Sequence, residues 1–142
     1  MSSSCSSDIE AVEEAVMTYV EGIVDFQFDK AESPWHQDGV KISYNAEAKT
    51  LNKKTIGETR PNLDQSQIGQ MMKRVTQQGR IESSDVTGNA AFVKLVWDFQ
   101  KDGEKKEITD YILLLKIDGE WKIVGKAFNE TAITGQGGTS SL

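Results

Sequence analysis

Apolar residues near the start of the chain recur at the spacing of an amphipathic helix. Ser7 and Glu10, just before this pattern, have the spacing of a capping box. We therefore expect a first helix from residue 8 to near residue 25, and a second, shorter helix around residues 29–36. Pro34 fits that second helix only in its first turn or at a break. The apolar face of the first helix would consist of Ile9, Val12, Val16, Tyr19, Val20 and Ile23.

The middle of the chain predicts a hairpin followed by a third helix. Residues 40–44 and 49–55 have the composition of two short strands. Pro61 then interrupts the chain, and a helix is expected to begin near Asp64 or Ser66 and to end near Gly79. The apolar face of this helix would consist of Ile68, Met71, Met72 and Val75.

The last third of the chain predicts four strands joined by tight turns. Asp-Gly pairs at 102–103 and 118–119 separate alternating segments, and this is a strong hairpin signal. The expected strands are residues 81–86, 90–100, 106–117 and 121–133. Together the elements predict a single α+β domain over residues 8–133. Its curved antiparallel sheet combines the meander with the N-terminal hairpin, and about three helices cover the concave face. Residues 1–7 would be a disordered leader and residues 134–142 a flexible Gly/Ser-rich tail.

The two faces of this meander can be assigned from residue numbers. If the Asp-Gly hairpins close with two-residue loops, directly paired residues have numbers of opposite parity, and only a β-bulge would shift this. The first face is then almost wholly apolar and must be covered by the helices. Gly125 and Ala127 lie on it and are too small to fill the space of a larger side chain. We therefore expect a cavity at that end of the first face.

The second face has an apolar middle and charged margins, and we expect it to contact a partner surface. The partner expected is a second copy of the chain. The residues expected in this homodimer interface are Val96, Tyr111, Leu113, Val124 and Phe128.

Asp110 is the best functional candidate, because a carboxylate on an apolar face is costly unless it is paired, hydrogen-bonded or neutralised. His36 could exchange protons with it, and Tyr19 could donate to a developing enolate oxygen. Structural roles are equally open: His36 could hydrogen-bond the end of the second helix, and Asp110 could be satisfied by a backbone amide or by Tyr19. The residues expected to line the ligand site are Trp35, Trp97, Ile112, Gly125, Ala127 and Asn129.

Composition removes several function classes. Of the 142 residues, 16 are basic and 22 acidic, and the basic residues are scattered, which opposes nucleic-acid binding. No apolar stretch has the length of a membrane span, and a cytoplasmic location is expected. The single cysteine excludes a disulfide within the chain, and one histidine with scattered carboxylates predicts no metal site. No cofactor is expected.

Three segments together resemble the putative lumazine-binding family of the nuclear transport factor 2-like (NTF2-like) superfamily. They are residues 109–124 (TDYILLLKIDGEWKIV), residues 19–23 (YVEGI) and residues 35–38 (WHQD), in the same order as in the family. That superfamily also holds SnoaL-type cyclases, ketosteroid isomerases and scytalone dehydratase. The resemblance extends over nearly all of residues 9–128 and implies a cone-shaped fold of the cystatin-like type.

Three functions are compatible with this sequence. The first is a small-molecule-binding domain with a pocket for an apolar or aromatic ligand between the helices and the sheet. The second is a cofactor-free isomerase, dehydratase or cyclase that uses the same pocket. The third is a dimerisation or assembly module that works through the second face of the sheet.

Overall fold

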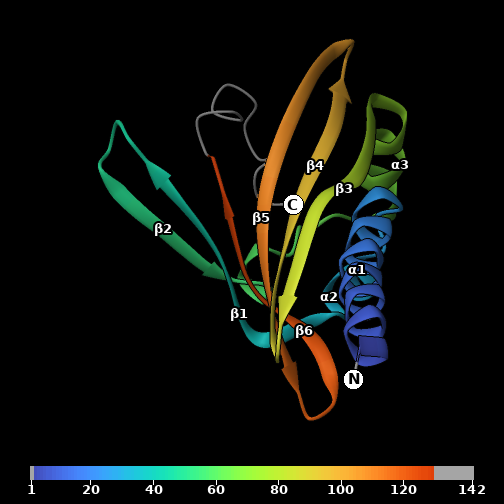
Figure 1. Ribbon diagram of the computed structural model, residues 1–142. Helices are drawn as coiled ribbons and strands as arrows, with labels where there is room; N and C mark the ends of the chain where they lie inside the picture. Colours follow the sequence, from blue (N-terminus) through green and yellow to red (C-terminus); the bar gives the residue numbers. More distant parts are fainter. Residues whose placement is uncertain (1, 130–142) are drawn as a thin grey trace.

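The computed structural model describes residues 2–129, with side chains from residue 7 onward. A long helix, α1 (Ser2–Val24), packs along one face of a curved six-stranded sheet (Figure 1). We call this the inner face of the sheet, and the opposite one the outer face. The sheet order is β2-β1-β6-β5-β4-β3. The strands are β1 (Trp35–Asn45), β2 (Thr50–Thr55), β3 (Val75–Thr87), β4 (Ala90–Lys101), β5 (Glu104–Ile117) and β6 (Glu120–Phe128).

The predicted meander is present, and its Asp-Gly turns have the expected geometry. Asp102 and Gly103 have φ of 51° and 87°, and Asp118 and Gly119 have φ of 51° and 84°. Positive φ at both central residues is the signature of a type I′ turn, which matches the right-handed twist of the flanking strands. Both turns therefore close as two-residue loops.

The sheet is mixed rather than wholly antiparallel. β1 pairs antiparallel with β2 but parallel with β6. The helices α1 and α2 (Phe28–Glu32) bring the chain back to the end of the sheet where β6 begins. The Ile123 amide donates to the Pro34 carbonyl there over 2.8 Å, so β1 starts beside β6 and runs in the same direction.

A β-bulge in β6 changes the predicted faces. Leu114 pairs with Ile123, but Leu113 pairs with Gly125, so Val124 is the extra residue. Beyond the bulge, residues of β6 therefore face the side of the sheet opposite to the one predicted from their numbers. The assignment of Gly125 and Ala127 to the cavity face is therefore wrong, and so is that of Phe128 to the interface face. A Cβ placed on Gly125 would meet the Leu113 side chain, which confirms that Gly125 faces outward.

The boundaries of the first two helices differ from the predicted ones. α1 begins at Ser2, so residues 2–7 continue the helix instead of forming a disordered leader. The serines there cost only about 0.5 kcal/mol each relative to alanine, and no glycine or proline precedes Gly22. α2 ends at Glu32, because Pro34 has no backbone N–H with which to continue the helical hydrogen bonds, and Trp35 and His36 belong to β1 instead.

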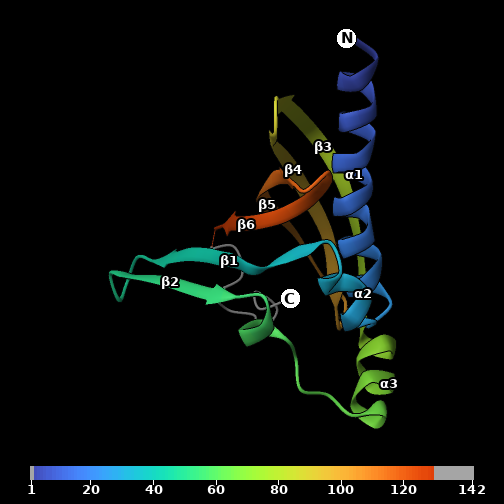
Figure 2. The ribbon, with the colours of Figure 1, turned by 90° about the horizontal axis from the view of Figure 1, so that it is seen from below.

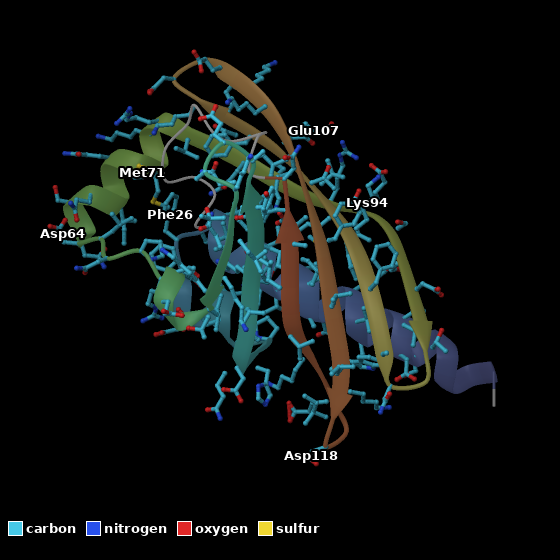
Figure 3. The ribbon with its side chains drawn as sticks, turned by 90° about the vertical axis from the view of Figure 1, so that its left-hand side faces the viewer. Phe26, Asp64, Met71, Lys94, Glu107 and Asp118 are labelled. Carbon is cyan, nitrogen blue, oxygen red and sulfur yellow. The ribbon has the colours of Figure 1, made fainter. Side chains whose placement is uncertain are left out.

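The third helix, α3 (Gln65–Arg74), does not cover the inner face. It begins at an Asp64 capping box, and β3 starts directly after it at Val75, so the expected end near Gly79 is too late. Figure 2 shows α3 beyond the C-terminal end of α1, linked to β2 through a short 3-10 turn (Gly57–Thr59) and an extended segment. None of its residues is buried, and Met71 lies at the margin of the molecule (Figure 3).

The core lies between α1 and the inner face. It is built from apolar side chains of α1 and of the central strands: Val12, Val16, Val20, Val93, Leu95, Ile112, Leu114 and Ile123. Among the described residues, no helix has the length and apolarity needed to cross a membrane. The predicted tail at residues 134–142, and the end of the last predicted strand at residues 130–133, lie outside the described residues.

Candidate functional site

A buried carboxylate on β5 organises a polar cluster on the inner face. Asp110 is 2% exposed, and its Oδ2 accepts a hydrogen bond of 2.9 Å from Trp97 Nε1 of β4. Lys126 of β6 is 4% exposed, and its Nζ lies 3.5 Å from the same oxygen. The neighbouring strands therefore hold the carboxylate between an indole N–H and an ammonium group, which satisfies the requirement for pairing that burial imposes.

Tyr19 of α1 completes this cluster from the helical side. Lys126 Nζ donates a hydrogen bond of 3.2 Å to the Tyr19 hydroxyl oxygen. The Tyr19 ring is fully buried and meets the Trp97 ring edge-on, with 6.4 Å between the centroids. Because an ammonium group has no lone pair, the proton of Tyr19 must be directed to an acceptor other than Lys126.

The cluster fixes the charge state of two of its members. Burial opposes the charge on Lys126, but Asp110 and Tyr19 outweigh it, and the pKa of the ammonium is raised above its ordinary value. Burial raises the pKa of Tyr19, and Asp110 adds to the rise against the opposing effect of Lys126. At neutral pH the site therefore holds a lysine cation beside a neutral phenol.

A second buried lysine lies directly beside the first. Lys41 of β1 is the parallel cross-strand partner of Lys126, and it is 5% exposed. Burial, and then the charge of Lys126, lower the pKa of Lys41 to about 6, against the opposing effects of Asp110 and Glu32. Two adjacent lysines on the inner face thus differ in protonation: at neutral pH Lys126 is charged and most of Lys41 is neutral.

Trp35 adds a hydrogen-bond donor to this wall. Its ring meets the Tyr19 ring edge-on at 5.6 Å between centroids, and Lys41 Nζ lies 5.9 Å from the Trp35 centroid. The buried Trp35 Nε1 has no hydrogen-bond acceptor among the described residues. A buried donor without a partner costs about 1–3 kcal/mol. An oxygen atom of a ligand would remove that cost.

A small cavity reaches Lys41 and Tyr19 from the side of α2. Its volume is about 10 Å³, which is room for about one water molecule. Arg60 forms part of its wall. The Arg60 guanidinium contacts Asp29 of α2 and donates a hydrogen bond of 2.6 Å to Glu32 of the same helix. The remaining lining residues are Ile23, Phe28, Ala31, Ile56, Thr59 and Pro61. A ligand larger than water therefore requires the wall of this cavity to move.

The predicted pair of His36 and Asp110 is not brought together. His36 Nδ1 accepts a 3.0 Å hydrogen bond from the Asp38 amide, and its side chain is one-third exposed. Trp35, the residue before His36, pairs with Ile123 of β6, and Ile123 pairs with Leu114 of β5. Leu114 is four residues away from Asp110 along β5. Of the three predicted catalytic residues, only Tyr19 and Asp110 share a site.

The predicted ligand-binding residues divide between the two faces. Trp35, Trp97 and Ile112 are buried on the inner face. Gly125 and Ala127 face outward because of the bulge, and Asn129 is exposed just beyond β6. The pocket wall is therefore more polar than the apolar wall expected from the sequence.

Sequence reasoning missed both lysines. Residue parity places Lys126 on the same face as Val124 and Phe128, away from the helices, and the bulge at Val124 inverts this. Lys41 lies between Val40 and Ile42, a context typical of a side chain that points to solvent, yet Lys41 is buried. No residue pattern near either lysine indicated burial. Within the described part of the chain, no three His, Cys, Asp or Glu residues gather as metal ligands.

Comparisons with known proteins agree with this architecture. The model of the family described as putative lumazine-binding matches residues 7–129. The aldolase FrzH of Cladobotryum sp. is 29% identical over 125 residues, which cover 87% of this chain and 92% of that protein. An NTF2-like protein from Shewanella baltica has a TM-score of 0.64 at 19% identity, covering 86% of this chain and 92% of that one.

A more distant structural neighbour is a ketosteroid isomerase-like protein from Erwinia carotovora atroseptica. Its TM-score is 0.57 at 13% identity, and the superposition covers 84% of this chain and 93% of that one. Identities this low carry the fold alone. The cone-shaped α+β fold of the NTF2-like type is thus shared, and what this particular site does has to be argued from its own residues.

Proposed function

Because the chain belongs to the putative lumazine-binding family, we propose that its inner face binds a small molecule through a carbonyl oxygen. The observation that carries this proposal is the Lys126 ammonium, which Asp110 and Tyr19 hold in a buried position, with the Tyr19 ring also contacting Trp35. An oxygen placed there would meet a full positive charge in low-dielectric surroundings, where it acts far more strongly than in water.

This arrangement suits reactions in which negative charge develops on a carbonyl oxygen. Such charge develops when a proton leaves the carbon next to the carbonyl group, and also when a nucleophile adds to the carbonyl carbon. Donors that are already in position stabilise the charge without reorganisation. In our proposal the ammonium of Lys126 supplies most of this stabilisation, and the hydroxyl of Tyr19 and the N–H of Trp35 complete the donor set.

Asp110 has a supporting role in this proposal. Its carboxylate keeps Lys126 charged and fixes the Trp97 ring, so we assign it to positioning rather than to proton exchange with His36. The role of Tyr19 as a donor to a developing oxyanion is retained from the sequence.

The name of the Cladobotryum relative supports an aldol-type reaction. An aldol reaction joins a carbon next to one carbonyl group to the carbon of a second carbonyl group, and its nucleophile is an enolate or an enamine. The donor set described above would serve that chemistry. Isomerisation or dehydration through an enolate would use the same donors, and we place these reactions second because the neighbour described as ketosteroid isomerase-like is only 13% identical.

Binding of a planar phenolate, which carries a delocalised oxygen anion, tests the proposal. We expect calorimetry to detect one binding site in the wild-type protein. The double variant Asp110→Asn/Lys126→Met should lose this binding, because it removes the ammonium while leaving no lone buried charge. Since the amide oxygen of the introduced asparagine can still accept from Trp97, the fold should persist.

The matched control is Lys53→Met, which removes a lysine from the exposed strand β2. It should bind the phenolate as the wild-type protein does. Equal binding by the wild-type protein and the folded double variant would refute the role of Lys126.

A further inference from the structure

We infer that Lys41 is the amine that forms a Schiff base with the carbonyl group of the ligand, while the neighbouring Lys126 remains an ammonium ion. This inference rests on the proposed function, because it requires the ligand to be an aldehyde or a ketone bound at the inner face. It adds a covalent step and assigns that step to one residue.

The geometry distinguishes the two lysines. They are direct partners on adjacent strands, which lie about 4.8 Å apart in a sheet, and both are buried. Asp110, the one buried carboxylate among the described residues, lies against Lys126 and also hydrogen-bonds Trp97. Its charge is therefore committed to Lys126.

Other charged or titratable groups also face Lys41. From α2, Glu32 favours protonation of Lys41. However, Arg60 donates a hydrogen bond of 2.6 Å to the Glu32 carboxylate. From α1, Tyr19 is a neutral phenol. Burial and the charge of Lys126 both oppose protonation of Lys41. Asp110 favours protonation, but its effect is weaker than either of these. The balance leaves Lys41 mostly deprotonated at neutral pH, as a nucleophilic amine requires.

The covalent step balances as follows. The nitrogen of Lys41 attacks the carbonyl carbon, the C–N bond forms, and the π electron pair moves to oxygen beside Lys126. One proton passes from nitrogen to that oxygen, which gives a carbinolamine. A second proton, supplied by solvent, reaches the hydroxyl group, the C–O bond breaks, and water leaves. The product is a protonated imine, and transfer of a proton from the adjacent carbon to solvent turns it into an enamine, the nucleophile of an aldol reaction.

Reductive trapping tests this inference on the residue itself. The protein is treated with a limiting amount of acetaldehyde and sodium cyanoborohydride at about pH 7, where ordinary lysines with a pKa of about 10.4 are almost fully protonated. We expect peptide mapping to find the ethyl group on Lys41 at least about tenfold more often than on any other lysine, given the difference in neutral amine. The α-amino group at the N-terminus also reacts near this pH and is mapped separately.

Two variants complete the design. Lys41→Met should eliminate the trapped adduct, and Lys53→Met should leave both the adduct and phenolate binding in place. If Lys41 is alkylated no more than Lys53 while phenolate still binds, the Schiff-base inference is overturned and the proposed function survives. If phenolate binding also fails in the wild-type protein, both are overturned.

Discussion

Lys41 should make the stability of this protein depend on pH between about 6 and 10.5, the range between its native and its ordinary pKa. In that range the unfolded state binds one more proton than the native state, so the free energy of unfolding rises with pH. The slope for one proton is at most about 1.4 kcal/mol per pH unit. Lys126 has the opposite sign, because its raised pKa adds stability that is lost only above 10.5.

Lys41→Met should therefore be more stable than the wild-type protein at neutral pH, and its stability should vary less between about pH 6.5 and about pH 9. Urea denaturation at several pH values measures this difference. Lys53→Met, on the exposed strand β2, is the control and should follow the wild-type curve. A parallel pH dependence in wild type and Lys41→Met would contradict a native pKa near 6.

The partnership of Asp110 and Lys126 makes a second prediction at the residue scale. Asp110→Asn keeps the acceptor for Trp97 but leaves Lys126 buried without its counter-charge, and we expect it to lose about 3 kcal/mol. Adding Lys126→Met should restore much of this loss, because the lone charge is gone. A double-mutant cycle by urea denaturation measures the coupling, and additive losses would show that the two side chains do not interact.

Single residues were the least predictable part of the site. Asp110 and Tyr19 could be identified because a carboxylate and a phenol interrupt apolar patterns on elements with clear periodicity. The two lysines could not be identified, since a lysine in a strand ordinarily faces solvent and its burial depends on partners from other strands. His36 was misplaced because its position depends on where α2 ends.

At the scale of elements, the contact between α1 and α2 depends on Gly22. A Cβ at this position would lie 2.3 Å from the backbone nitrogen of Ala31, and a backbone atom cannot turn aside as a side chain can. Gly22→Ala should therefore cost about 2–3 kcal/mol of stability, although alanine favours a helix. Because Tyr19 lies one turn earlier in α1, the substitution should also weaken phenolate binding.

Gly69, in the middle of α3, is the matched control. Nothing lies within 4 Å of a Cβ built there, so Gly69→Ala should gain about 0.5–1 kcal/mol. Thermal denaturation of both variants measures the contrast. Stabilisation by Gly22→Ala would mean that α1 and α2 are farther apart than the structure has them.

The number and order of elements followed from the sequence, whereas several boundaries and one strand direction did not. Asp-Gly turns and alternating apolar residues are local signals, and the four-stranded meander they predicted is present. The parallel pairing of β1 with β6 and the bulge at Val124 arise from contacts between distant segments. Neither has a local signature, and the bulge alone moved Lys126 to the inner face.

At the scale of the whole molecule, the outer face retains an exposed apolar row on β5. Tyr111, Leu113 and Leu115 lie at alternate positions of that strand, and Leu113 is 54% exposed. Charged residues border this row, including Lys94 and Glu107, which lie on the side of the sheet away from α1 (Figure 3). We propose that a second copy of the chain covers this row, as expected from the sequence, but without Phe128, which faces inward, and without Val96, which is 1% exposed within the single chain.

Leu113→Lys should convert such a dimer to a monomer by placing charge in the interface. Sedimentation equilibrium measures the mass. Leu51 is an exposed leucine on β2, and β1 and β6 separate that strand from β5 in the sheet. Leu51→Lys should therefore leave the assembly unchanged. A wild-type protein that stays monomeric at all accessible concentrations would contradict the proposed interface.

The most direct test of the account is exchange of the protons next to a carbonyl group with deuterium from the solvent. NMR follows this exchange for acetone and for the larger ketone acetophenone in the presence of the protein. We predict that the wild-type protein and Lys53→Met accelerate exchange for at least one of the two ketones, and that Asp110→Asn/Lys126→Met does not. Equal exchange rates with the folded double variant and the wild-type protein would contradict a carbonyl site on the inner face.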